Sequence, residues 1–152
     1  MRILPSRPIA LIVAALAVTT LGLAACSSSD TATASAPAVS ATLPTPDAPQ
    51  RVDAGTFAAA VATPGVTVVD VRTPEEFASG HIEGAVNIDV EGPDFATGIA
   101  GLDPSKTYAV YCRAGNRSQV AVAQMSQAGI AHIYELQTGI NGWTSAGYPV
   151  VS

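Results

Sequence analysis

The chain has 152 residues, with 7 lysines and arginines against 12 aspartates and glutamates, so its formal charge at pH 7 is −5. An acidic chain repels polyanions by its overall field, so we expect it to bind neither nucleic acid nor an anionic lipid surface by charge.

The N-terminal segment has the features of an export signal. Arg2 and Arg7 form a positive start, residues 9–18 form an apolar core, and residues 23–26 read Leu-Ala-Ala-Cys. The apolar core is too short to span a membrane comfortably. The Leu-Ala-Ala-Cys sequence resembles a bacterial lipobox, which implies cleavage before Cys26 and attachment of a diacylglyceryl group to its sulfur. This predicts an extracytoplasmic protein, lipid-anchored to the bacterial cell membrane; the alternative, an ordinary signal peptide with an incidental cysteine, leaves the protein periplasmic.

Residues 26–49 form a predicted tether. After Cys26 this segment consists mainly of Ser, Thr, Ala and Pro, with almost no large apolar side chain. It therefore cannot bury enough surface to offset the entropy of ordering, and we expect it to be disordered. Loss of residues 1–25, the predicted signal peptide, removes two arginines and takes the charge from −5 to −7. Any membrane anchor of so acidic a protein must therefore be covalent. Residues 50–152 are then long enough for one domain with a single core.

Strand and helix signals alternate along this domain. Asp53 can cap a helix that runs through Ala60. The sequence Thr73-Pro74-Glu75-Glu76 places a glutamate three residues after a threonine cap, which is a capping box. Four apolar runs predict strands and one segment with helical spacing predicts a further helix: 66–69, 85–88, 108–111 and 132–134 for the strands, and 118–128 for the helix. The alternation predicts an α/β layered fold with a parallel sheet and right-handed crossovers.

Two chemically capable side chains follow predicted strands. Asp70 ends the strand at 66–69 and Cys112 ends the strand at 108–111. Ligands of parallel sheets collect beyond the carboxyl ends of the strands, so we expect both residues at the same edge. Asp70 either orients donors of the neighbouring loop or caps its own turn. Arg72 and Glu76 are four positions apart and are expected to pair across the start of the helix.

The loop after the strand at 108–111 reads Cys-Arg-Ala-Gly-Asn-Arg-Ser, from Cys112 to Ser118. In such a strand-to-helix turn the peptide N–H groups and the positive end of the helix can hold an anion without a metal. Arg113 and Arg117 add charge to the same turn. A buried small hydrophobe is one role for Cys112, but cationic and helix-terminal surroundings lower the pKa of a thiol, so a reactive thiol is favoured.

Four segments of the domain are similar to the signatures of the single-domain rhodaneses, the thiosulfate sulfurtransferase family: 69–77, 80–88, 112–118 and 139–149. The resemblance covers about residues 51–150, with Thr138 as a departure where the family often has a second glycine. It implies a rhodanese-like three-layer α/β fold with a central, mainly parallel five-stranded sheet flanked by helices. We expect a monomer without a cofactor, because no cluster of His and Cys has the spacing of a metal site and no nucleotide-binding loop is present.

The same resemblance implies transfer of a sulfane sulfur from thiosulfate or a similar donor to a thiophilic acceptor, cyanide or a thiol. Cys112 would attack the outer sulfur of the donor and carry it as a persulfide. Arg113 and Arg117 would hold the oxyanion end and stabilise the departing sulfite, while the loop N–H groups hold the persulfide. The residues assigned to substrate are Arg113, Ala114, Gly115, Asn116, Arg117 and Ser118, with Asp70 as a candidate supporting residue.

The length of the loop separates two chemistries on this fold. Four residues lie between Cys112 and Arg117, whereas the related cell-cycle phosphatases and arsenate reductases have one residue more. The shorter loop suits a sulfane sulfur better than a tetrahedral phosphate, which makes a phosphatase or arsenate reductase the less favoured alternative. A sulfur-carrier or binding module that does not turn over its donor is the other alternative.

Overall fold

The computed structural model describes residues 43–152. The predicted signal peptide, the lipidation candidate Cys26 and the first part of the predicted tether lie outside the described residues. None of the helices in the described range has the length and apolarity that a membrane span requires.

The end of the predicted tether, residues 43–49, lies against the domain. The Tyr134 hydroxyl donates to the carbonyl oxygen of Pro44, and His132 Nδ1 lies 2.7 Å from the carbonyl oxygen of Pro46. Pro46 is buried. Ordered contacts with the domain thus begin before residue 50, where the sequence predicts the domain to start.

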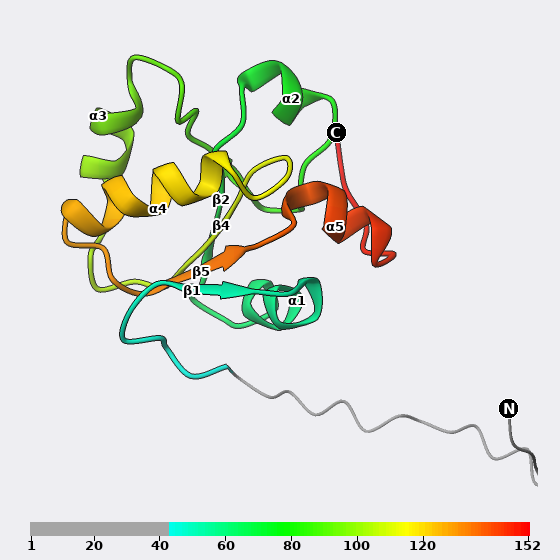
Figure 1. Cartoon of the computed structure of the whole chain (residues 1–152), viewed down its shortest axis with the longest axis horizontal. Coiled ribbons are helices and arrows are strands. Elements are labelled where there is room, and N and C mark those ends of the chain that lie inside the picture. Colours follow the sequence, from blue (N-terminus) through cyan, green and yellow to red (C-terminus); the bar gives the residue numbers. More distant parts are fainter. Residues whose placement is uncertain (1–42) are drawn as a thin grey trace, which may run out of the picture. The chain divides into compact units, whose positions relative to one another are not determined.

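One parallel sheet forms the centre of the domain, with five strands in the order β1-β5-β4-β2-β3 (Figure 1). The strands are β1 (Gln50–Val52), β2 (Thr67–Asp70), β3 (Val86–Asn87), β4 (Tyr108–Tyr111) and β5 (Ile133–Leu136). The helices are α1 (Ala54–Val61), α2 (Pro74–Ala78), α3 (Phe95–Ala100), α4 (Arg117–Gln127) and α5 (Gly139–Ser145).

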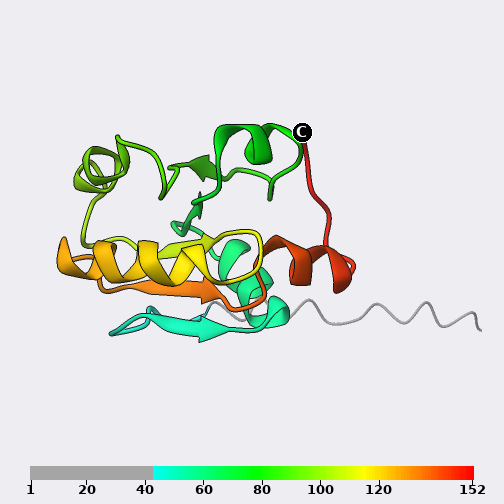
Figure 2. The ribbon, with the colours of Figure 1, turned by 45° about the horizontal axis from the view of Figure 1, so that its top comes forward.

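Helices cover both faces of the sheet, as the alternation of side chains along β4 demonstrates. Tyr108, Val110 and Cys112 join the core cluster that α3 and α4 complete, whereas Ala109 and Tyr111 join the cluster that α1 and α5 complete. Successive strand residues point to opposite faces, so a strand buried on both sides is apolar throughout. The predicted three-layer α/β fold with a central parallel sheet is confirmed (Figure 2).

The predicted helix starts are confirmed in atomic detail. The Asp53 carboxylate accepts a hydrogen bond from Thr56 N at 2.8 Å and caps α1. Thr73 and Glu76 form the reciprocal capping box of α2, each side chain bonded to the other residue's backbone N–H at 3.3 Å. These two contacts satisfy backbone donors that the first turn leaves without a helical partner.

Element boundaries differ from the predicted ones by one or two residues. The strand predicted at 108–111 is β4 as expected, while β2 runs one residue further and includes Asp70. The strand predicted at 85–88 shortens to β3, and the one predicted at 132–134 extends to Leu136. The elements β1, α3 and α5 have no counterpart among the predicted ones.

Candidate active site

The catalytic candidates meet at the carboxyl edge of the sheet. Asp70 in β2 pairs in register with Tyr111 in β4, and Glu135 in β5 pairs with Val110. Cys112 follows β4 directly, so its sulfur lies beyond the end of the central strand, where parallel sheets place their ligands. The prediction that Asp70 and Cys112 share one edge is confirmed.

The loop from Cys112 to Asn116 is held by backbone contacts with α5. Ile140 N donates to the carbonyl oxygen of Cys112 at 2.8 Å, and Asn141 N donates to that of Arg113 at 3.1 Å. These donors belong to the first turn of α5, whose N–H groups have no partner within the helix. The start of α5 therefore provides donors for the carbonyl groups of the Cys112 loop. The N–H groups of the loop remain available to point toward the Cys112 sulfur.

Gly115 gives the loop its tight curl. Its φ of 84° lies in the left-handed region, and a Cβ at this position would stand 1.9 Å from the carbonyl oxygen of Gln137. Both the conformation and the close approach of the backbone exclude any other residue without rearrangement. The curl brings Gly115 N to 3.1 Å from Cys112 Sγ, where it donates a hydrogen bond to the sulfur.

The Cys112 thiol is buried, with 1% of the residue exposed. Burial alone would raise its pKa, but the hydrogen bond between the thiol and the Ser118 hydroxyl and those from the backbone N–H groups of Ser118, Ala114 and Gly115 outweigh burial and hold the pKa below its ordinary value. Such a pKa increases the fraction of thiolate, the nucleophilic form, near neutral pH. The surroundings of Cys112 are those of a reactive thiol.

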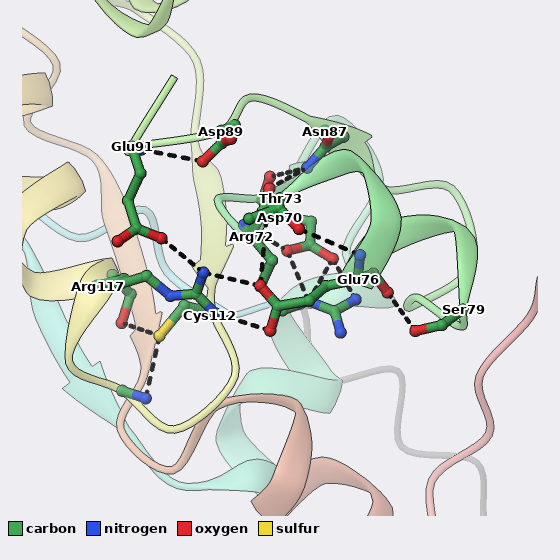
Figure 3. Close-up of polar contacts among 12 residues, drawn as sticks. Asp70, Arg72, Thr73, Glu76, Ser79, Asn87, Asp89, Glu91, Cys112 and Arg117 are labelled. Carbon is green, nitrogen blue, oxygen red and sulfur yellow. Dashed lines mark hydrogen bonds and ion pairs between the residues drawn. The ribbon is translucent and has the colours of Figure 1, made fainter. Parts of the chain in front are cut away.

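Arg117 points toward two carboxylates rather than into open space. Its guanidinium bonds both carboxylate oxygens of Glu76 at 2.8 Å and one oxygen of Glu91 at 2.9 Å (Figure 3). Burial lowers the pKa of Arg117, but these carboxylates raise it above its ordinary value. The positive charge predicted to hold an oxyanion is thus already balanced in this arrangement.

The remaining loop residues predicted to bind substrate have distinct places. Arg113, Ala114 and Asn116 are exposed, and Ser118 is fully buried beside the sulfur. The Arg113 side chain forms no ion pair with any residue between 43 and 152. Arg113 is therefore the loop cation that is available to an incoming anion.

Asp70 is committed to Arg72. Its buried carboxylate accepts from Arg72 N at 2.9 Å and from the Arg72 guanidinium at distances down to 2.6 Å. The Arg72 guanidinium also donates to the carbonyl oxygen of Gly80 at 2.7 Å. The predicted pairing of Arg72 with Glu76 is wrong, because Arg72 turns back to Asp70 and Glu76 binds Arg117. Of the two roles considered for Asp70, these contacts correspond to the local one at the turn between β2 and α2.

Two further residues of the site, Glu135 and Arg51, were not predicted. The Glu135 carboxylate accepts a hydrogen bond from the Ser118 hydroxyl at 2.7 Å, and its other oxygen lies 2.8 Å from Arg51 Nε. Arg51 also donates to the carbonyl oxygens of Gly115 and Gln137, at 3.3 and 3.2 Å. The one signal in the sequence was a charged residue at position 135, inside an apolar strand.

No group of three or more His, Cys, Asp or Glu side chains that could hold a metal ion occurs among the residues the structure describes.

Comparisons with known proteins agree with this arrangement. The family described as Rhodanese-like domain matches residues 53–146. The chain belongs to the rhodanese-like family.

Named relatives and solved structures support this assignment over most of the rhodanese-like domain. Thiosulfate sulfurtransferase GlpE of Pseudomonas aeruginosa is 41% identical over 85 residues, which cover 56% of this chain and 74% of the relative. A sulfurtransferase of Allochromatium vinosum is 32% identical over 90 residues, covering 59% and 82%. The crystal structure of a rhodanese-related protein from Thermoplasma volcanium is 35% identical, with a TM-score of 0.60 and coverage of 67% and 97%. The rhodanese-like domain places the chain in a sulfurtransferase family.

Proposed function

We propose that the protein transfers a sulfane sulfur from thiosulfate or a similar donor to a thiophilic acceptor, cyanide or a thiol, through a persulfide on Cys112. The observation that carries this proposal is the buried Cys112 sulfur, which accepts the Gly115 N–H at 3.1 Å in a loop that leads into α4. A curled loop at a helix start favours negative charge on a bound atom. Both a thiolate and a persulfide carry that charge.

The proposed reaction has two displacements. The Cys112 thiolate attacks the outer sulfur of thiosulfate, a new S–S bond forms, and sulfite leaves with the electron pair of the broken S–S bond. Arg113, exposed at the mouth of the loop, is placed to attract the oxyanion end of the donor. Cyanide or a thiolate then attacks the outer sulfur of the persulfide and regenerates the Cys112 thiolate.

An intact-mass measurement tests this proposal. After incubation with thiosulfate the mass of the protein should rise by one sulfur atom, and after addition of cyanide it should return. Cys112→Ser should abolish both changes, and an aryl phosphate offered to the parent should remain unhydrolysed. Sulfur transfer by the serine variant, or faster hydrolysis of the phosphate than transfer of sulfur, would show the assignment to be wrong.

We also propose that the protein is exported and anchored to the bacterial cell membrane through a lipid on Cys26. The support is the Leu-Ala-Ala-Cys sequence at residues 23–26 after an apolar core. In a bacterium with lipoprotein processing the protein should partition into the detergent phase, and Cys26→Ala should release it or leave it unprocessed. Normal cleavage and equal partitioning of the two proteins would contradict the anchor.

A further inference from the structure

Glu135 is a buried carboxylate that the proposed sulfur transfer does not use. Only 1% of the residue is exposed, and both carboxylate oxygens have partners. Arg51 Nε binds one oxygen at 2.8 Å, and the Ser118 hydroxyl donates to the other at 2.7 Å. Ser118 Oγ in turn lies 3.5 Å from Cys112 Sγ. The four side chains form an unbroken chain of contacts from the nucleophile to a cation at the edge strand β1.

The single hydroxyl proton of Ser118 fixes the direction of this chain. An ionised carboxylate only accepts hydrogen bonds, so at 2.7 Å the proton of Ser118 points to Glu135. The oxygen of Ser118 therefore presents a lone pair to Cys112, and the thiol is the donor in the contact between them. With Ser118 in this state, a bare thiolate on Cys112 would face a lone pair instead of a proton.

We propose that Glu135 is the acceptor of the Cys112 proton, which it receives through Ser118. The thiol proton moves to Ser118 Oγ as the Ser118 proton moves to Glu135 Oε1. The result is a thiolate, a serine whose hydroxyl now donates to that thiolate, and a carboxylic acid that donates to the serine. Both hydrogen bonds reverse together, so no buried polar group loses its partner in either state.

The surroundings stabilise the negative charge both when it lies on Glu135 and when it lies on Cys112. Arg51 compensates a negative charge on Glu135, whereas Gly115 N and the start of α4 favour a negative charge on Cys112. Among residues 43–152, no other charged side chain forms an ion pair or hydrogen bond with these four residues: α1 and α5 contain no charged residue, and Arg117 on α4 binds Glu76 and Glu91. The negative charge of the network thus passes between Glu135 and Cys112 without entering solvent.

This inference rests on the proposed sulfur transfer and adds a place for the proton during it. The proton stays on Glu135 during the departure of sulfite and for as long as the persulfide is present. It returns to Cys112 after the acceptor removes the outer sulfur. Protons balance over the cycle, because the donor supplies and the acceptor removes only the sulfur atom. Glu135 acts on the sulfur through Ser118, so it is a positioning residue whose measurable consequence is a pH profile.

Alkylation of Cys112 by iodoacetamide tests the relay without any sulfur donor. In the parent the thiolate can form by internal proton transfer, so the alkylation rate should level off toward acid at the value set by that transfer. In Glu135→Gln the thiol has no internal acceptor, and the rate should keep falling roughly tenfold per pH unit. At about pH 5.5 the variant should react at least about tenfold more slowly than the parent, and the two rates should converge at alkaline pH.

Glu135→Gln also removes the ion-pair partner of Arg51 and could destabilise the fold, so a second variant tests the relay independently. Ser118→Ala keeps the ion pair of Arg51 with Glu135 but interrupts the relay, so it should lose the acid plateau as well. Glu83→Gln, which removes the same charge at an exposed position, should keep the parent profile. A parent rate that falls as steeply as that of Glu135→Gln, or a plateau that survives in Ser118→Ala, would overturn the relay. Absence of a persulfide in the mass experiment would instead overturn the proposed function, since alkylation does not depend on it.

Discussion

The two arginines of the Cys112 loop differ in how available their charges are to an anion. Arg117 forms ion pairs with Glu76 and Glu91, at 2.8 and 2.9 Å, so its net attraction for an anion is reduced. Arg113 is exposed and free of ion pairs among residues 43–152. Attraction of a donor therefore rests mainly on Arg113 and on the backbone N–H groups of the loop, which act at short range.

Asp70 is expected to matter for stability and not for sulfur transfer. Asp70→Asn leaves the Arg72 guanidinium, 4% exposed as a residue, without its negative partner, and the loss of one partner of a buried pair costs about 3–5 kcal/mol. Urea unfolding should show this loss, while the rate of persulfide formation per folded molecule stays near that of the parent.

Asp53→Asn serves as the control for that substitution. Asp53 caps α1 at an exposed position, and asparagine caps helices about as well as aspartate. Its unfolding midpoint should hardly change. A large fall in persulfide formation by folded Asp70→Asn would assign Asp70 to the chemistry of the loop.

At the scale of elements, the active loop is clamped between the start of α5 and the segment that leaves β5. The carbonyl oxygen of Gly115 accepts from Arg51 and from Gln119, the latter at 2.7 Å. A Cβ on Gly139, whose φ is 59°, would stand 2.4 Å from the carbonyl carbon of Arg113. Two glycines thus allow three backbone segments to approach closely, and this packing gives the loop its shape before any donor arrives.

Gly115→Ala should disrupt this clamp, and Gly129→Ala provides a matched comparison. Both glycines have a positive φ, but a Cβ on Gly129 would meet nothing within 4 Å. Backbone strain alone costs about 1–2 kcal/mol, and forcing atoms into a packed site adds roughly 1–3 kcal/mol. Gly115→Ala should therefore lower the free energy of unfolding by more than Gly129→Ala and should abolish persulfide formation. Equal unfolding energies and a normal mass shift in both variants would contradict the clamp.

The sequence predicts those elements whose signal is local. The apolar run of β4 and the capping box of Thr73 each depend only on residues that are neighbours in the sequence, and both are confirmed. By contrast, α5 starts at Gly139 and contains Gly142, a poor helix composition, and it forms where its first N–H groups meet the Cys112 loop. Its stability comes from tertiary contacts: these backbone hydrogen bonds and the burial of Ile140 and Trp143 in the core.

The same distinction applies to the site. The Cys112 loop lies within one continuous segment, so its character could be predicted. The pair of Arg51 and Glu135 joins positions far apart in the chain and exists because β1 pairs with β5 in parallel register. Arg72 could not be assigned to Asp70 from spacing alone, since helical spacing favoured Glu76 and the turn geometry favoured Asp70.

For the whole molecule, the acidic charge opposes the proposed anionic donor. Loss of residues 1–25 would leave a charge of −7, and Glu76 and Glu91 add negative charge beside the loop. Thiosulfate is a dianion, so the acidic protein repels it at long range before it reaches the hydrogen-bond donors of the Cys112 loop. Short-range donors and long-range repulsion have different salt dependences, because screening acts on the second much more than on the first.

The rate constant kcat/KM for thiosulfate should therefore rise with sodium chloride at low ionic strength, with cyanide saturating. The Debye length is about 10 Å at about 0.1 M salt, so most of the rise should occur below that concentration. Glu91→Gln removes the carboxylate that lies 2.9 Å from Arg117 and should raise the low-salt value about two- to fivefold, the size of an exposed ion pair. It should also flatten the salt dependence, whereas Glu83→Gln should change both much less. A kcat/KM that falls with salt from the lowest concentration would show that Arg113 and Arg117 dominate the approach, and that the acidic surface does not oppose it.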